Sequence, residues 1–146
     1  HLLGVRELVA GDAEAGLQRL SARLPVAGLT NGNADLGAVG IAPLFVFSLS
    51  AREYGAAKPD AGLFHEACKR LGLPPGAVLH VGDDPRTDVA GAAKAGLQTC
   101  WIDRGDHAWP DEIALADVEV TTLTALADVL DARFDPDTHL HKEQAA

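Results

Sequence analysis

Three carboxylates that could hold a metal ion, Asp83, Asp84 and Asp88, follow the short apolar run of residues 78–81. The run is long enough for a buried strand, and Gly82 lets the backbone turn sharply after it. Carboxylates this close together repel one another and destabilise the fold unless a cation lies among them. Oxygen ligands suit a hard ion such as Mg²⁺, and open α/β sheets bind their ligands at the carboxyl ends of the strands. The cluster therefore predicts a Mg²⁺ site at the end of this strand.

A purely structural explanation exists for two of the three carboxylates. Asp84 and Asp88 could cap the helix that begins at Pro85 and interact with the positive end of its dipole. This explanation does not account for Asp83, which lies at the strand end before the cap. The metal site is therefore the preferred hypothesis, and the sequence leaves open whether Asp84 is a ligand or a cap.

Two further polar sites are candidates for binding phosphate. Thr30, Asn31 and Gly32 follow the apolar stretch 26–29, where a hydroxyl and exposed backbone amides could bind a phosphate group. An ordinary Asn-Gly turn is the alternative.

Lys58 is held in an extended conformation by the proline after it and could act as a point charge for phosphate. The alternative is an ordinary loop lysine exposed to solvent.

Alternating strands and helices must position these residues. The apolar patterns predict strands at residues 26–29, 44–49, 78–81, 97–102 and 118–120. They predict helices within residues 5–24, 36–41, 60–71, 85–95 and 123–130, with Asp60 as the cap of the third. This alternation is typical of the α/β class, with a mainly parallel sheet covered by helices on both faces. The expected organisation is a core over residues 1–134 and a polar tail over residues 135–146.

Composition narrows the class of protein and its partners. The chain has 146 residues, 47% of them hydrophobic, which suffices for one domain with its own core. The net charge of −9 argues against nucleic acid or an anionic membrane as the main partner, and no apolar run is long enough to span a bilayer. Cys68 and Cys100 lie among apolar neighbours, which favours two buried free thiols in a cytoplasmic protein, with a disulfide as the alternative. The oligomeric state is not predicted.

Taken together, three stretches resemble the motifs of a known family. Residues 29–33, 58–60 and 81–92 are similar to the second, third and fourth motifs of the haloacid dehalogenase superfamily of phosphatases. The resemblance covers residues 20–132, and the run over residues 100–102 is closest to the branch with a helical cap. It implies that family's Rossmann-like three-layer α/β/α core. Some members of the branch dephosphorylate flavin-pathway intermediates, and others act on sugar phosphates.

The resemblance also implies roles for the phosphate-binding candidates. Thr30 would hydrogen-bond the transferring phosphoryl group, helped by the backbone at Asn31 and Gly32. Lys58 would pair with the phosphate and with the nucleophile. Thr30 and Lys58 are therefore candidate catalytic residues.

The candidate metal residues are Asp83, Asp84 and Asp88. By resemblance, Asp83 would ligate Mg²⁺, and Asp88 would be a catalytic supporting carboxylate that orients a metal-bound water or Lys58. Asp84 would be either a second ligand or a cap. Phosphoryl transfer needs charge neutralisation and positioning, and a cation and a lysine that face the phosphate oxygens supply both.

The family's first motif, an apolar strand that ends in Asp-x-Asp, has no counterpart here. Asp12 follows no apolar strand, and Asp103 and Asp106 come too late and have the wrong spacing. In the family this strand is central to the sheet, so its loss would leave two inner strand edges unpaired. The chain also does not begin with Met. We therefore expect the nucleophile strand and the cap to lie in an N-terminal segment outside these residues, and the chain to be inactive without it.

The leading functional hypothesis is a Mg²⁺-dependent phosphatase that hydrolyses a small phosphorylated metabolite through an aspartyl-phosphate. One alternative is a non-catalytic relic or partner-binding module, and another is a 2-haloacid dehalogenase-type hydrolase. A phospho-receiver domain is disfavoured, because its acidic pair would precede Thr30 and Lys58 in the chain rather than follow them. The substrate itself is not predicted.

Overall fold

The computed structural model describes residues 2–4, 12–30, 44–55, 60–105 and 108–134. Within them the strands are β1 (Leu2–Gly4), β2 (Ala27–Thr30), β3 (Phe47–Ser50), β4 (Leu79–Gly82), β5 (Gln98–Ile102) and β6 (Val118–Val120). The helices are α1 (Asp12–Arg23), α2 (Ala51–Tyr54), α3 (Ala61–Leu71), α4 (Gly91–Lys94) and α5 (Leu123–Phe134). Two further elements are the 3₁₀ turn η2 (Pro75–Ala77), which is wound more tightly than an α-helix, and the π-helical turn η3 (Pro85–Ala90), which is wound more widely.

The strands form one parallel sheet. Among the described residues its order is β3-β2-β1-β4-β5-β6, and every pair of neighbours runs parallel. Parallel neighbours need crossover connections, which place the intervening helices on the faces of the sheet. The predicted α/β class with a mainly parallel sheet is confirmed.

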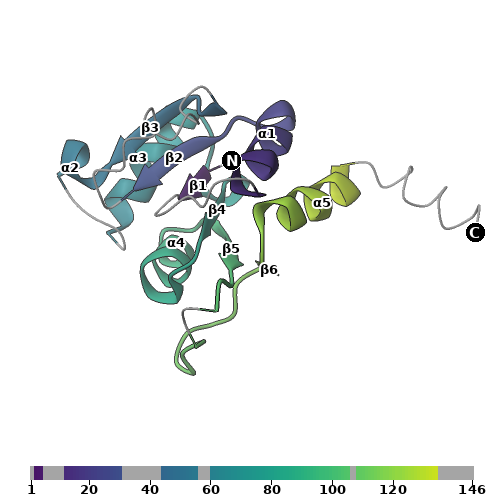
Figure 1. The fold of residues 1–146 in the computed structure, drawn as a ribbon. Helices are drawn as coiled ribbons and strands as arrows, with labels where there is room; N and C mark the ends of the chain where they lie inside the picture. Colours follow the sequence, from purple (N-terminus) through teal and green to yellow (C-terminus); the bar gives the residue numbers. More distant parts are fainter. Residues whose placement is uncertain (1, 5–11, 31–43, 56–59, 106–107, 135–146) are drawn as a thin grey trace, which may run out of the picture.

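The centre of the sheet differs from the expectation drawn from the sequence. We expected the inner edges of β2 and β4 to be unpaired within these residues. Instead β1 lies between them (Figure 1), with Leu3 opposite Gly28 on one side and opposite Val81 on the other. Open inner edges would leave backbone N–H and C=O groups without partners, and the short apolar β1 pairs with both. This strand carries no carboxylate, so it does not supply the missing first motif.

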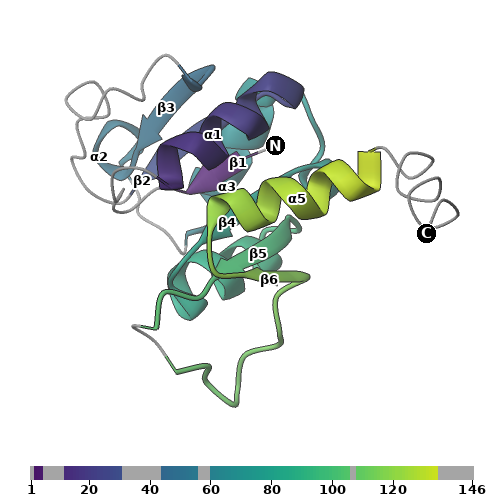
Figure 2. The same cartoon turned by 45° about the vertical axis from the view of Figure 1, so that its right-hand side comes forward.

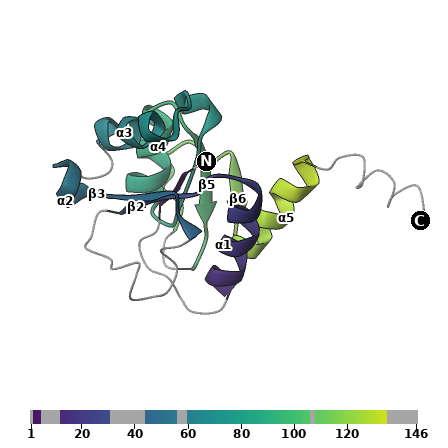
Figure 3. The same cartoon turned by 90° about the horizontal axis from the view of Figure 1, so that it is seen from above.

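Helices cover both faces of the sheet. Figure 3 shows α3 and α4 on one side of it and α1 and α5 on the other. Leu79 and Val81 belong to the apolar cluster that includes α1 and α5, whereas Val78 belongs to the cluster that includes α3 and α4. Alternate residues along this segment therefore serve opposite faces, as a strand buried on both sides requires.

The helices α1 and α5 also pack against each other, side by side in Figure 2. Leu17 and Leu20 of α1 share one buried cluster with Leu123 and Leu126 of α5. The two helices, which are distant in sequence, therefore form one layer on the face of the sheet opposite α3 and α4.

Local signals set several helix ends. The Asp60 side chain accepts a hydrogen bond from the Gly62 amide at 2.8 Å and caps α3, as predicted. Gly72 ends α3 with a φ of 72°, a conformation that favours glycine. The helix predicted over residues 85–95 is instead the π-helical turn η3 followed by α4. None of the described helices has the length and apolar character needed to cross a membrane.

Candidate functional site

The carboxyl ends of the parallel strands lie along one edge of the sheet. Thr30 is the last residue of β2, and Asp83 directly follows Gly82 at the end of β4, with β1 between these two strands. Thr30 and the carboxylate cluster therefore leave the sheet at the same edge, where α/β folds bind their ligands. The other predicted phosphate-binding residues lie outside the described residues: Asn31, Gly32 and Lys58.

Asp83 has a carboxylate oxygen that nothing in the described chain satisfies. Its Oδ1 is buried and has no hydrogen-bond partner among the described residues. Burying an anionic oxygen without a partner is costly, and such atoms in a folded protein call for an explanation. A bound cation would satisfy this oxygen, so Asp83 fits the role of a Mg²⁺ ligand.

Asp84 uses one carboxylate oxygen to cap the helical turn that follows. Its Oδ1 accepts hydrogen bonds from the backbone amides of Arg86, at 2.9 Å, and Thr87, at 3.1 Å. These amides are among the first N–H groups of η3, which have no partner within the turn. The capping role that the sequence left open is therefore present in the structure.

Asp88 is a buried carboxylate with hydrogen bonds at both oxygens. Its side chain is 1% exposed. Its Oδ1 lies within hydrogen-bond distance of His80 Nε2, at 3.1 Å, and its Oδ2 accepts from the Asp84 amide at 3.1 Å. A Cβ on Gly82 would overlap the Asp88 carboxylate, so glycine is required where β4 ends. Asp88 thus supports the loop from within.

The three carboxylates do not assemble into one ligand set. In the part of the chain that the structure describes, no group of three or more His, Cys, Asp or Glu side chains is placed to hold a metal ion. The reason is that Asp84 turns toward the start of η3 and Asp88 turns back toward His80. The predicted roles of Asp83, Asp84 and Asp88 at a metal ion stay predictions.

Two aromatic residues of the site were not identified from the sequence. The sequence predicts His80 only as part of an apolar strand, and Trp101 as part of a strand and of the family resemblance. His80 packs edge-on against Phe64 with ring centroids 5.0 Å apart, and Trp101 Nε1 donates to the backbone oxygen of Asp83 at 2.9 Å. A polar ring inside an otherwise apolar strand was the available signal, because a buried ring nitrogen needs a partner.

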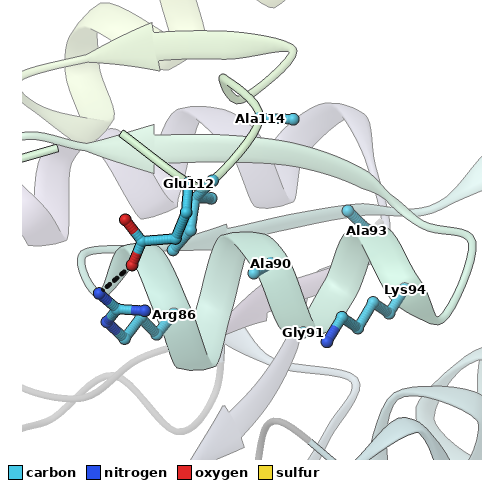
Figure 4. Close-up of a pocket in the computed structure, with 8 residues that line it drawn as sticks. Arg86, Ala90, Gly91, Ala93, Lys94, Glu112 and Ala114 are labelled. Atoms are coloured by element: carbon cyan, nitrogen blue, oxygen red, sulfur yellow. Dashed lines mark hydrogen bonds and ion pairs between the residues drawn. The ribbon is translucent and has the colours of Figure 1, made fainter. Parts of the chain in front are cut away.

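A pocket lies against the same helical segment. It has a volume of about 510 Å³ and lies between η3, α4 and the turn that contains Glu112. Figure 4 shows Glu112 paired with Arg86 at one end and Lys94 at the other. Hydrogen bonds from its own backbone amide and from Arg86 lower the pKa of Glu112. The pocket includes none of the predicted site residues.

Both cysteines are buried free thiols, as predicted. Burial raises the pKa of the Cys100 thiol to about 12 and also raises that of Cys68. A thiol with a raised pKa carries little thiolate at neutral pH and is a poor nucleophile. Neither cysteine is therefore a candidate catalytic residue.

Comparison with known proteins gives the site a family context. Residues 55–132 match a family model described as HAD-hyrolase-like. The chain is 37% identical over 118 residues to the 5-amino-6-(5-phospho-D-ribitylamino)uracil phosphatase YigB of Escherichia coli, a match that covers 78% of this chain and 49% of that protein. It is 41% identical over 100 residues to the phosphoserine phosphatase of Thermus thermophilus, covering 64% of this chain and 40% of that enzyme. The chain thus spans about half or less of the length of these relatives.

Solved structures agree with this context and with the predicted resemblance. The crystal structure of a 2-haloacid dehalogenase from Pseudomonas syringae superposes with a TM-score of 0.80 and 36% identity, over 87% of this chain and 54% of that one. A HAD phosphatase from Thermococcus onnurineus gives a TM-score of 0.75 and 28% identity, over 84% of this chain and 58% of that one. On its sequence and its fold, this chain belongs to the haloacid dehalogenase superfamily.

Proposed function

We propose that the protein is a Mg²⁺-dependent phosphatase that hydrolyses the phosphate monoester of a small metabolite. The proposed reaction passes through an aspartyl-phosphate that water then hydrolyses, and we expect its aspartate outside these residues. Relatives named as phosphatases of a phosphoribityl compound and of phosphoserine support this reaction class. Two buried free thiols suit a reducing compartment, so we place the reaction in the cytoplasm.

One observation carries the proposal, the buried Oδ1 of Asp83 without a hydrogen-bond partner among the described residues. It lies in the residue that follows β4, at the edge of the sheet where ligands bind. The protein has a net charge of −9, so a phosphate approaching this edge needs local positive charge. Mg²⁺ held by Asp83 would supply that charge to the phosphate oxygens.

The other residues would bind and orient the substrate. Thr30, with the amides of Asn31 and Gly32, would donate hydrogen bonds to the phosphoryl oxygens, and Lys58 would hold a further oxygen by its charge. Asp88 would act indirectly, because it holds the Asp84 amide behind the metal ligand. Each role is one of positioning or charge compensation, which is what phosphoryl transfer demands.

The proposal is tested by Mg²⁺ binding and phosphate release in matched variants of the full-length protein. We expect Asp83→Asn to weaken Mg²⁺ affinity in calorimetric titration by about tenfold or more, since loss of even an outer partner of a metal ligand has effects of 10–100-fold. Phosphate release from a panel of sugar, ribityl and amino-acid phosphates should fall with it. Asp111→Asn, which changes an exposed carboxylate, is the control and should match the unchanged protein.

Two results would contradict the phosphatase proposal. One is phosphate release that persists undiminished in excess chelator. The other is release of halide from 2-haloacids without any phosphatase activity, which the structural match to a 2-haloacid dehalogenase makes the second candidate reaction. A protein that binds no Mg²⁺ and turns over neither substrate class would instead be a non-catalytic module.

A further inference from the structure

The peptide unit between Asp83 and Asp84 is held at both of its polar ends. Its carbonyl oxygen, which belongs to Asp83, accepts from Trp101 Nε1 at 2.9 Å. Its N–H, which belongs to Asp84, donates to Asp88 Oδ2 at 3.1 Å. The C=O and N–H of a trans peptide point in opposite directions, so Trp101 and Asp88 hold the plane from opposite sides.

Each of the two holding groups is itself buried and fixed. Trp101 is 5% exposed, and the β4–β5 register places it opposite Gly82, the residue before Asp83. Asp88 is bonded to the buried His80. Neither group can rotate away without giving up a partly buried hydrogen bond, which costs up to about 1–3 kcal/mol for the group left unsatisfied. The orientation of the peptide is therefore set by the packed core rather than by the loop.

A second tryptophan fixes the first. The rings of Trp101 and Trp109 meet edge to face with centroids 4.8 Å apart and planes at 61°, an arrangement that aromatic pairs prefer. Trp109 Nε1 in turn donates to the carbonyl of Ile113 at 2.9 Å. Glu112, in the same turn, is paired with Arg86 of η3 (Figure 4). The turn thus contacts both Trp101 and the helical segment that carries Asp88.

We propose that Trp101 is a positioning residue, which together with Asp88 clamps the Asp83–Asp84 peptide and so points the Asp83 carboxylate at its metal ion. Because Gly82, on the other side of Asp83, is held by its pairing with β5, fixing this peptide plane restricts the ψ angle of Asp83 and with it the direction in which that side chain leaves the backbone. A pre-oriented ligand loses less conformational freedom on binding, which raises affinity without a new contact. The link to metal binding rests on the proposed function, whereas the clamp itself does not.

The test removes the indole N–H of Trp101 in the full-length protein. It measures Mg²⁺ affinity and the exchange rate of the Asp84 amide separately. In Trp101→Phe the carbonyl of Asp83 loses its donor, and we expect Mg²⁺ affinity to fall about fivefold, the size of one hydrogen bond of about 1 kcal/mol. Without metal, the Asp84 amide should exchange with solvent about tenfold faster by NMR, because freeing the peptide loosens its bond to Asp88. Trp109→Phe is the matched control, since it keeps a ring against Trp101 and leaves the Trp101 N–H intact. Both quantities should stay within about twofold in it.

A smaller ring could also loosen the packing. Incorporation of 3-benzothienyl-alanine at position 101 keeps the shape of the side chain and removes only the N–H. It should reproduce both effects at an unchanged thermal midpoint, which a purely structural role would not do. If neither Mg²⁺ affinity nor Asp84 exchange changes in this variant, the proposal is overturned. If the unchanged protein binds no Mg²⁺, the phosphatase proposal fails. In that case the clamp is judged by amide exchange alone: faster exchange of the Asp84 amide in the variant supports it, and unchanged exchange refutes it.

Discussion

Three neighbouring aspartates of one short stretch have three different environments. Asp83 has a buried oxygen without a hydrogen-bond partner among the described residues, Asp84 caps η3, and Asp88 is bonded to His80 inside the protein. The residue type is the same, so the difference comes from position relative to the end of β4 and the first turn after it. Substitutions in this stretch should accordingly act through different properties of the carboxylate.

At the residue scale we predict that the structural role of Asp84 depends on its oxygen and not on its charge. Asp84→Ala removes the acceptor of the Arg86 and Thr87 amides and should lower the free energy of unfolding by about 1 kcal/mol, whereas Asp84→Asn keeps an acceptor and should cost far less. Urea unfolding followed by circular dichroism, in chelator, measures both. Equal destabilisation by Ala and Asn would show that charge dominates at this position.

Among the elements, α1 and α5 approach so closely that one position of their interface admits only glycine. A Cβ at Gly16 of α1 would lie 2.5 Å from the Cβ of Leu123 and 2.7 Å from its carbonyl carbon. Backbone atoms cannot move aside as the tip of a side chain can. Exposed ion pairs from Arg19 to Asp128, at 2.8 Å, and to Asp131, at 2.7 Å, flank the contact, but solvent screens such pairs and they add little stability.

At the element scale we predict that Gly16→Ala destabilises the protein although alanine is the better helix former. Overpacking of this kind costs about 1–3 kcal/mol, which exceeds the gain of about 1 kcal/mol in helix propensity. The thermal midpoint should fall. Gly76→Ala is the matched control, because a Cβ there meets nothing within 4 Å, and its midpoint should barely change. A Gly16→Ala protein more stable than the original would disprove the close contact.

For the whole molecule, the sheet separates two apolar clusters, and each contains one buried cysteine. Cys100 lies in the cluster under α1 and α5, and Cys68 in the cluster under α3 and α4. Both are at most 2% exposed. Their reaction with a thiol reagent therefore requires the corresponding layer to open.

We predict that raising the pH destabilises the native protein through Cys100. Its folded pKa is about 12 against an ordinary value of 9.0, so between these pH values the unfolded chain has lost a proton that the native state keeps. The unfolded state is then favoured as the pH rises, by at most about 1.4 kcal/mol per pH unit. The urea midpoint should fall between pH 8 and pH 10.5, and this fall should be smaller in Cys100→Ala than in the original protein. An equal fall in both would show that this thiol contributes nothing.

A dithiobis-nitrobenzoate assay at pH 8 provides a second check on the same thiol. Cys100 should react only at the rate of global unfolding, since its strand is paired on both sides. Labelling much faster than unfolding would show that the layer under α1 and α5 opens locally.

The amino-acid sequence was sufficient to predict the features that depend on neighbouring residues. Short apolar runs and the helical spacing of apolar residues identified the α/β class, Asp60 was recognised as a helix cap, and the carboxylates were placed after a buried strand. These signals are local, because a cap, a turn or an amphipathic stretch is specified within a few residues. Three short motifs in the family's order were likewise enough to indicate the family, which the comparisons confirm.

Contacts between residues that are distant in the sequence became visible in the folded chain. Leu3 pairs with Gly28 and Val81 at the centre of the sheet, although three residues carry almost no strand signal of their own. Trp101 reaches the Asp83 carbonyl from 18 residues away because the β4–β5 register brings them together. Strand order and register depend on the burial of the entire chain, since sliding a strand by one residue would reverse the face of every side chain. Residue types and spacing therefore indicated which side chains could take part in the chemistry, while the orientation of these side chains followed from the packing of the sheet.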